Sequence, residues 1–105
     1  MMAVETFARE VQSMRDAQKR WAAVGSLATL DESIRRERFV DMILPDAPDH
    51  PLTREVSVMR QLQRHNEESG TLLMDMRRRE HSVDLLVREV LQPWPEEYFE
   101  LGGGK

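Results

Sequence analysis

The amino-acid sequence predicts an all-α fold, in which two tandem helical hairpins form a four-helix-bundle-like domain that is followed by a short carboxyl-terminal helix. Two observations predict this fold class. Apolar side chains recur every three or four residues through most of the chain, and no useful stretch alternates with the period of two that a strand requires. In addition, two blocks of sequence occur twice in the same order, as an internal duplication would produce.

The repeated blocks define two halves of the chain. Each block lies at a similar distance from its copy, and the matched ranges are residues 10–18 with 55–63 and residues 35–41 with 78–84. Gly25 and Gly70 lie at equivalent places between the blocks, where each half is expected to turn. We therefore expect hairpin 1 at about residues 3–44 and hairpin 2 at about residues 53–91, within a single helical domain over residues 1–105.

The first half reads as two helices. The first helix is expected to end at Gly25, since glycine readily adopts the left-handed conformation of a helix C-cap. Its apolar stripe consists of Val4, Phe7, Val11, Met14, Gln18 and Trp21. The second helix runs to about residue 44. Thr29 and Glu32 fit a capping box at its start, and Ser26 fits equally well as the cap.

Three prolines in residues 45–51 predict a connector between the halves, because proline lacks the amide donor that a helix interior needs. The third helix is expected to start near Thr53. Beyond it two possibilities stay open. The repeat predicts a break at Gly70, whereas a single glycine costs a continuous helix about 1 kcal/mol, so that one helix over residues 53–91 is the alternative. An aromatic tail over residues 93–101 is expected either to close one end of the bundle or to contact a partner.

Composition excludes several functional classes. The 105 residues contain no cysteine, which excludes disulfides and thiolate metal sites. The sequence has no apolar run long enough for a transmembrane helix and no secretory signal pattern. The net charge of −4 argues against a dedicated nucleic-acid binder, which usually carries a positive excess. We therefore expect a cytoplasmic protein that binds neither membranes nor nucleic acid.

Four acidic residues form the first candidate site. Each half carries a glutamate and an aspartate one helical turn apart, and the four residues are Glu37, Asp41, Glu80 and Asp84. If they converge, they could hold Mg²⁺, which prefers oxygen ligands. The arrangement is similar in outline to the all-helical nucleotide pyrophosphatases of the MazG type, although that family spaces the acids three apart and has a glutamate-rich first motif that is not clear in this chain. The alternative interpretation is that each acid pairs with a nearby arginine.

The arginines of the second block form another candidate site. Planar guanidinium groups suit phosphates and carboxylates, so a nucleotide or another anionic ligand would fit Arg35, Arg36, Arg78 and Arg79. The alternative is a solvated helix face with local ion pairs. Other side chains are expected in the core, namely His65, Met14, Met42, Met59, Met74 and Met76, although a methionine-rich groove for partner helices is the alternative for the methionines.

Residues 7–44 carry a resemblance. The run of residues 14–21, followed by Glu37, Val40, Asp41 and Leu44, resembles a pattern in small helical proteins of phages and prophages. Trp21 stands where that pattern usually has tyrosine or phenylalanine. The resemblance lends no catalytic residues that carry over to this chain, and we expect no cofactor. We therefore expect a non-enzymatic interaction or assembly protein that binds a protein partner or further copies of itself as a homo-oligomer. The expected contact residues are aromatic, namely Trp21, Trp94, Tyr98 and Phe99.

Overall fold

The fold class is confirmed. The computed structural model describes residues 2–69 and 73–92, and over these it is all-helical. The α-helices are α1 (Val4–Val24), α2 (Leu27–Ile43), α3 (Pro51–Ser69) and α4 (Leu73–Leu91). The second half is therefore two helices and not one continuous helix. The aromatic tail, with Trp94, Tyr98 and Phe99, lies outside the described residues.

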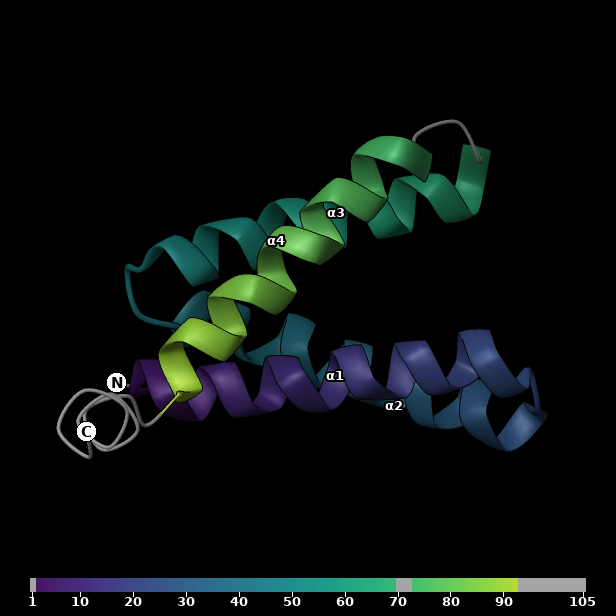
Figure 1. Cartoon of the computed structure of the whole chain (residues 1–105), viewed down its shortest axis with the longest axis horizontal. Coiled ribbons are helices and arrows are strands. Elements are labelled where there is room, and N and C mark those ends of the chain that lie inside the picture. Colours follow the sequence, from purple (N-terminus) through teal and green to yellow (C-terminus); the bar gives the residue numbers. More distant parts are fainter. Residues whose placement is uncertain (1, 70–72, 93–105) are drawn as a thin grey trace, which may run out of the picture.

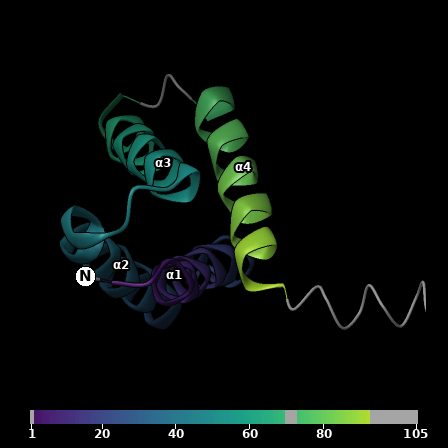
Figure 2. The ribbon, with the colours of Figure 1, turned by 90° about the vertical axis from the view of Figure 1, so that its left-hand side faces the viewer.

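Each half is a hairpin, and the two hairpins meet at one end (Figure 1). Helix α1 lies against α2 to form hairpin 1, α3 lies against α4 to form hairpin 2, and α1 also contacts α4. Figure 2 shows α4 above α1 and α3 above α2. The hairpins diverge from the connector, so that the end of α1 and the start of α4 lie at the opposite end, which we call the distal end.

Local hydrogen bonds explain why α1 ends and α2 begins where they do. Gly25 has a φ of 71°, and its N–H donates to the carbonyl of Trp21, as expected of a left-handed C-cap. The N-cap of α2 is Ser26 and not Thr29. The Ser26 hydroxyl accepts from the N–H of Thr29 at 3.2 Å, and the Thr29 hydroxyl accepts from the N–H of Ser26 at 3.1 Å. Thr29 is therefore the third residue of the helix and completes the capping box from inside.

The connector between α2 and α3 begins and ends slightly earlier in the chain than the sequence predicted. Residues Leu44–Asp46 form one turn of 3-10 helix after α2, and α3 begins at Pro51 rather than near Thr53. Proline suits the first position of a helix because the N–H that it lacks would have no partner there. The Nδ1 atom of His50 accepts from the N–H of Leu52 at 3.0 Å and so takes the place of a capping side chain.

The core lies at the connector end and draws equally on both hairpins. Fully buried side chains occupy equivalent positions of the repeat, namely Phe7 and Leu52, Val11 and Val56, Met14 and Met59, and Val40 and Val83. For three residues the predicted place in the core was wrong. His65 is exposed, and Met42 and Met74 are 64% and 67% exposed, because they lie away from the apolar faces of their helices.

We expect His50→Ala to lower the free energy of unfolding by about 1 kcal/mol, the usual cost of losing a capping acceptor. His50→Asp is the matched control, because a carboxylate oxygen can accept the same N–H, and it should stay near the wild-type value. Urea denaturation of the three proteins measures the difference. Equal losses in both variants would show that the imidazole stabilises the connector in some other way.

Candidate functional site between the hairpins

Two arginines near the middle of the molecule each bind an aspartate of the other hairpin. Arg15 on α1 donates from Nε and Nη2 to the carboxylate oxygens of Asp84 on α4, at 2.8 and 3.2 Å. Arg60 on α3 makes the same pair of hydrogen bonds to Asp41 on α2, at 2.8 and 3.0 Å. Both arginines are more than nine-tenths buried. Such bidentate, charge-assisted pairs fix the relative orientation of the groups that they join.

Two glutamines join the hairpins between these arginines. The Nε2 atom of Gln18 donates to Oε1 of Gln63 at 3.1 Å, and Nε2 of Gln63 donates to Oε1 of Gln18 at 3.2 Å. Each Oε1 also accepts from the arginine of its own helix, Arg15 or Arg60, at 2.6 Å. The two carboxamides thus face each other as an exchanged pair, with an arginine behind each one.

Two glutamates and two outer cations complete this network. Gln18 donates to Glu37 at 2.7 Å, and Gln63 donates to Glu80 at 2.8 Å. Each aspartate also receives a second, more exposed cation, Lys19 at 3.1 Å on Asp84 and Arg64 at 3.2 Å on Asp41. We call the whole set the inter-hairpin network, and it consists of Arg15, Gln18, Lys19, Glu37, Asp41, Arg60, Gln63, Arg64, Glu80 and Asp84. Its four cations balance its four carboxylates.

The charges of the network shift the titration of one member. Burial alone would raise the pKa of the Asp84 carboxyl. The hydrogen bonds and charges of Arg15 and Lys19 lower this pKa by a larger amount. The pKa of Asp84 therefore lies below its ordinary value of 3.8. A carboxyl with a lowered pKa contributes stability that is present above its ordinary pKa and is lost as the pH falls through the folded-state value.

The four acids of the proposed metal site are all members of this network. Asp41 and Asp84 each bind the buried arginine of the opposite hairpin, and Glu37 and Glu80 each bind a glutamine. Within residues 2–69 and 73–92, no group of three or more histidine or acidic side chains is placed to hold a metal ion. The alternative interpretation from the sequence, that each acid pairs with an arginine, describes all four acids, because Glu80 and Glu37 also form ion pairs with Arg15 and Arg60, at 3.8 and 3.9 Å.

The repeated arginines bind acids on the outside of the hairpins. Arg35 and Arg36 both bind Glu32 on their own helix, and Arg79 binds Glu55 on α3 at 2.8 Å. The hydrogen bond from Arg36 also lowers the pKa of Glu32. Arg78 is exposed and lines a shallow pocket that also contains Arg79. No described contact joins the arginines of one hairpin to those of the other.

Distal to the network, the hairpins leave a cleft of about 370 Å³, which we call the distal cleft. Network side chains line part of it, and the rest of its lining is Trp21, Ala22, Ser33, Asn66, Met76 and Arg77. Trp21, a contact residue predicted from the sequence, is 37% exposed there. The cleft therefore combines a charge-balanced interior with apolar side chains that face solvent.

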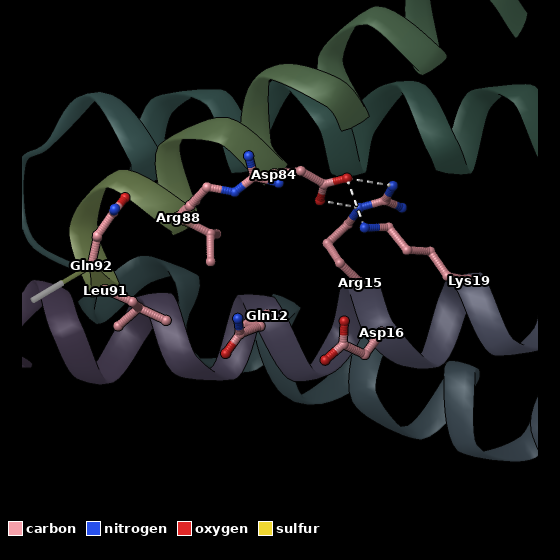
Figure 3. Close-up of a pocket in the computed structure, with 9 residues that line it drawn as sticks. Gln12, Arg15, Asp16, Lys19, Asp84, Arg88, Leu91 and Gln92 are labelled. Carbon is pink, nitrogen blue, oxygen red and sulfur yellow. Dashed lines mark hydrogen bonds and ion pairs between the residues drawn. The ribbon is translucent and has the colours of Figure 1, made fainter. Parts of the chain in front are cut away.

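A second pocket, of about 380 Å³, opens on the side of the molecule where α1 and α4 meet (Figure 3). Arg15 and Lys19 on α1 form ion pairs with the carboxylate of Asp84, and Arg88 on α4 lines the same pocket. The carboxamides of Gln12 and Gln92 and the carboxylate of Asp16 lie on the same pocket, together with the apolar Val87 and Leu91.

The comparisons give no relative from which a function could be inferred. No known family matches the chain, and no curated protein or solved structure is significantly similar to it. None of the described helices combines the length and apolar character needed to span a bilayer.

We expect Asp84→Asn to lower the free energy of unfolding at neutral pH by about 2 kcal/mol, because the buried Arg15 loses the charge of its main acceptor. Since the pKa of Asp84 is lowered, wild-type stability should fall below about pH 4, and this fall should be shallower in the variant. Denaturant titrations between pH 7 and pH 3 measure both effects. Asp16→Asn, at an exposed position of α1, is the control and should behave as the wild type does.

Proposed function

We propose that this chain is a non-enzymatic interaction and assembly protein that associates with further copies of itself through its distal end. The observation that carries the proposal is a group of exposed apolar side chains on both hairpins. They are Trp21, Val24 and Leu27 at the distal end of hairpin 1 and Leu73 and Met74 at the distal end of hairpin 2, and we call them together the distal surface, although the two hairpin ends lie apart (Figure 1). Leu27 is 84% exposed and Met74 is 67% exposed, although both are large enough to stabilise a core if they were buried.

Exposed apolar groups of this kind are typical of protein–protein contacts. Trp21 is the strongest candidate anchor, because tryptophan is enriched among the residues that dominate binding energy. It lies in the distal cleft beside Met76, whose flexible side chain can adapt to different surfaces. The network behind them holds the two walls of the cleft in a defined relation, which limits the cost of ordering them on binding.

A second copy of the chain is the partner that best fits this surface. An apolar surface needs an apolar partner, and the distal end of another copy supplies one. Two copies related by a two-fold axis would present the same hairpin ends to each other, which is the commonest arrangement in homo-oligomers. The resemblance of residues 7–44 to small helical phage proteins also fits an assembly role. We therefore infer a symmetric contact between distal ends.

We expect the average mass in solution to rise with protein concentration, and the pair Leu27→Glu and Met74→Glu to keep the chain monomeric. Burying the new carboxylates in an apolar contact would cost too much for the contact to persist. Light scattering over a wide range of concentrations measures the mass. The control pair, Thr6→Glu and Gln61→Glu, adds the same charge at exposed positions and should associate as the wild type does. A wild type that stays monomeric at every concentration would contradict the proposal.

The pocket in Figure 3 favours a second candidate function, the binding of a small anionic ligand. Lys19 and Arg88 flank it, and no described hydrogen bond or ion pair engages Arg88. A phosphate or carboxylate group placed there would compete with Asp84 for Lys19 and could accept from Arg88 and Gln12. This site differs from the arginine runs that the sequence suggested, since its cations come from the first helix and the last.

For this candidate we expect pyrophosphate and nucleotides to raise the melting temperature at low salt, by the equivalent of about 2.7 kcal/mol at one hundred times the Kd. Arg88→Ala should remove the effect, whereas Arg38→Ala, at an exposed position outside the pocket, should not. A thermal-shift series at increasing salt provides the measurement. An unchanged melting temperature with every anion would argue against this function.

A further inference from the structure

The contacts of the inter-hairpin network correspond one to one between the halves of the chain. Arg15 binds Asp84 just as Arg60 binds Asp41, with Nε to Oδ1 distances of 2.8 Å in both cases. In the repeat, Arg15 is equivalent to Arg60, and Asp41 is equivalent to Asp84. The remaining equivalent pairs behave alike as well, namely Gln18 with Gln63, Lys19 with Arg64, and Glu37 with Glu80.

This correspondence has a consequence for recognition. Hairpin 2 contacts hairpin 1 through an arginine, a glutamine and an aspartate. Hairpin 1 carries the same three residue types at equivalent positions. If a second hairpin 1 stood in the place of hairpin 2, Arg15 would face Asp41 of that copy, and Gln18 would face Gln18. Every charge-assisted contact between the hairpins would then be present again.

The apolar part of the interface supports the same substitution. Three fully buried residues of hairpin 1 have an identical and fully buried counterpart in hairpin 2, namely Val11 with Val56, Met14 with Met59 and Val40 with Val83. The buried pair Phe7 and Leu52 differs in volume, and the buried Ala8 and Ala17 are equivalent to the half-buried Thr53 and Leu62. The larger differences lie toward the distal end, where Trp21 is equivalent to Asn66 and Ser33 to Met76.

We infer that the inter-hairpin face of this chain is self-complementary, and that the partner it fits is a second copy of the chain, in which hairpin 1 pairs with hairpin 1 and hairpin 2 with hairpin 2. In the closed form, hairpin 1 packs against hairpin 2 of the same chain. The short connector keeps the two hairpins at a high effective concentration, which favours this form. The paired form uses the same contacts between two molecules. This inference rests on the network and is independent of the distal surface.

A reversal of charge in one hairpin tests this pairing. Arg15→Asp with Asp41→Arg reverses the face of hairpin 1 alone. In the closed chain the new carboxylate at position 15 faces Asp84, and the new guanidinium at position 41 faces Arg60. In the paired form each new group faces its opposite charge on the second copy, while Arg60 and Asp84 of hairpin 2 face each other between the copies.

The matched control reverses both hairpins by adding Arg60→Asp and Asp84→Arg. Its closed chain regains opposite charges at both positions, so it should have the mass of the starting protein. All proteins also carry Leu27→Glu and Met74→Glu, so that association through distal ends does not contribute. Light scattering should give the hairpin 1 variant twice the mass of the control, and circular dichroism should show that both are helical.

A hairpin 1 variant that is helical but has the mass of one chain would overturn the inference, and so would a variant that unfolds while the control folds. A control that fails to fold would overturn it as well, because the pairs would then not be interchangeable. A further measurement uses the variant reversed in hairpin 2 alone, with Arg60→Asp and Asp84→Arg. It should also have twice the mass of the control, and a mass of one chain would count against self-complementarity.

Discussion

Two buried guanidinium groups determine how the hairpins of this chain meet. Each of them, on Arg15 and Arg60, carries five donors that must be satisfied away from bulk water. The aspartate of the opposite hairpin takes one edge of each guanidinium, and the glutamine of the same helix takes a donor on the other side. Since removing one partner would leave a buried charge uncompensated, the hairpins are held to one relative position.

The same network bears on the chemistry that the molecule can perform. Its acids bind arginine and glutamine, so their charge is already balanced by neighbours rather than directed at a ligand. A balanced network of this kind adds little long-range field, and solvent-facing side chains then dominate recognition. For that reason the apolar distal ends, and the cation-flanked pocket beside Asp84, are the surfaces at which we propose binding.

The parts of the structure that depend on local chemistry could be predicted from the sequence. Proline and glycine marked the connector and the first turn, and apolar spacing on the first helix identified the core residues Phe7, Val11 and Met14. The error at the start of α3 has a local reason too, because Pro51 can begin a helix as well as interrupt one. The second turn was left open, since one glycine is weak evidence on its own.

The network could not be predicted, because its pairs join residues far apart in the chain. Arg15 and Asp84 are 69 residues apart. A signal was nevertheless present. Gln18 falls in the apolar stripe of the first helix, and Gln63 occupies the same place in the repeat. A polar residue that recurs in an apolar stripe, one turn after a recurring arginine, indicates a buried hydrogen-bonded pair. The more conspicuous arginine runs drew attention to the outer faces instead.

The position of the helix ends has a mechanical consequence. The start of α1 and the end of α4 lie at the same end of the molecule, next to the connector (Figure 1). A force that pulls Val4 away from Leu91 would therefore separate the hairpins progressively from that end, rather than slide them past each other. The apolar contacts would part first, and Arg15 with Asp84 would bear the load next. Because the contacts between the hairpins would break one after another, the hairpins would separate at low force and pack together again when the force is removed.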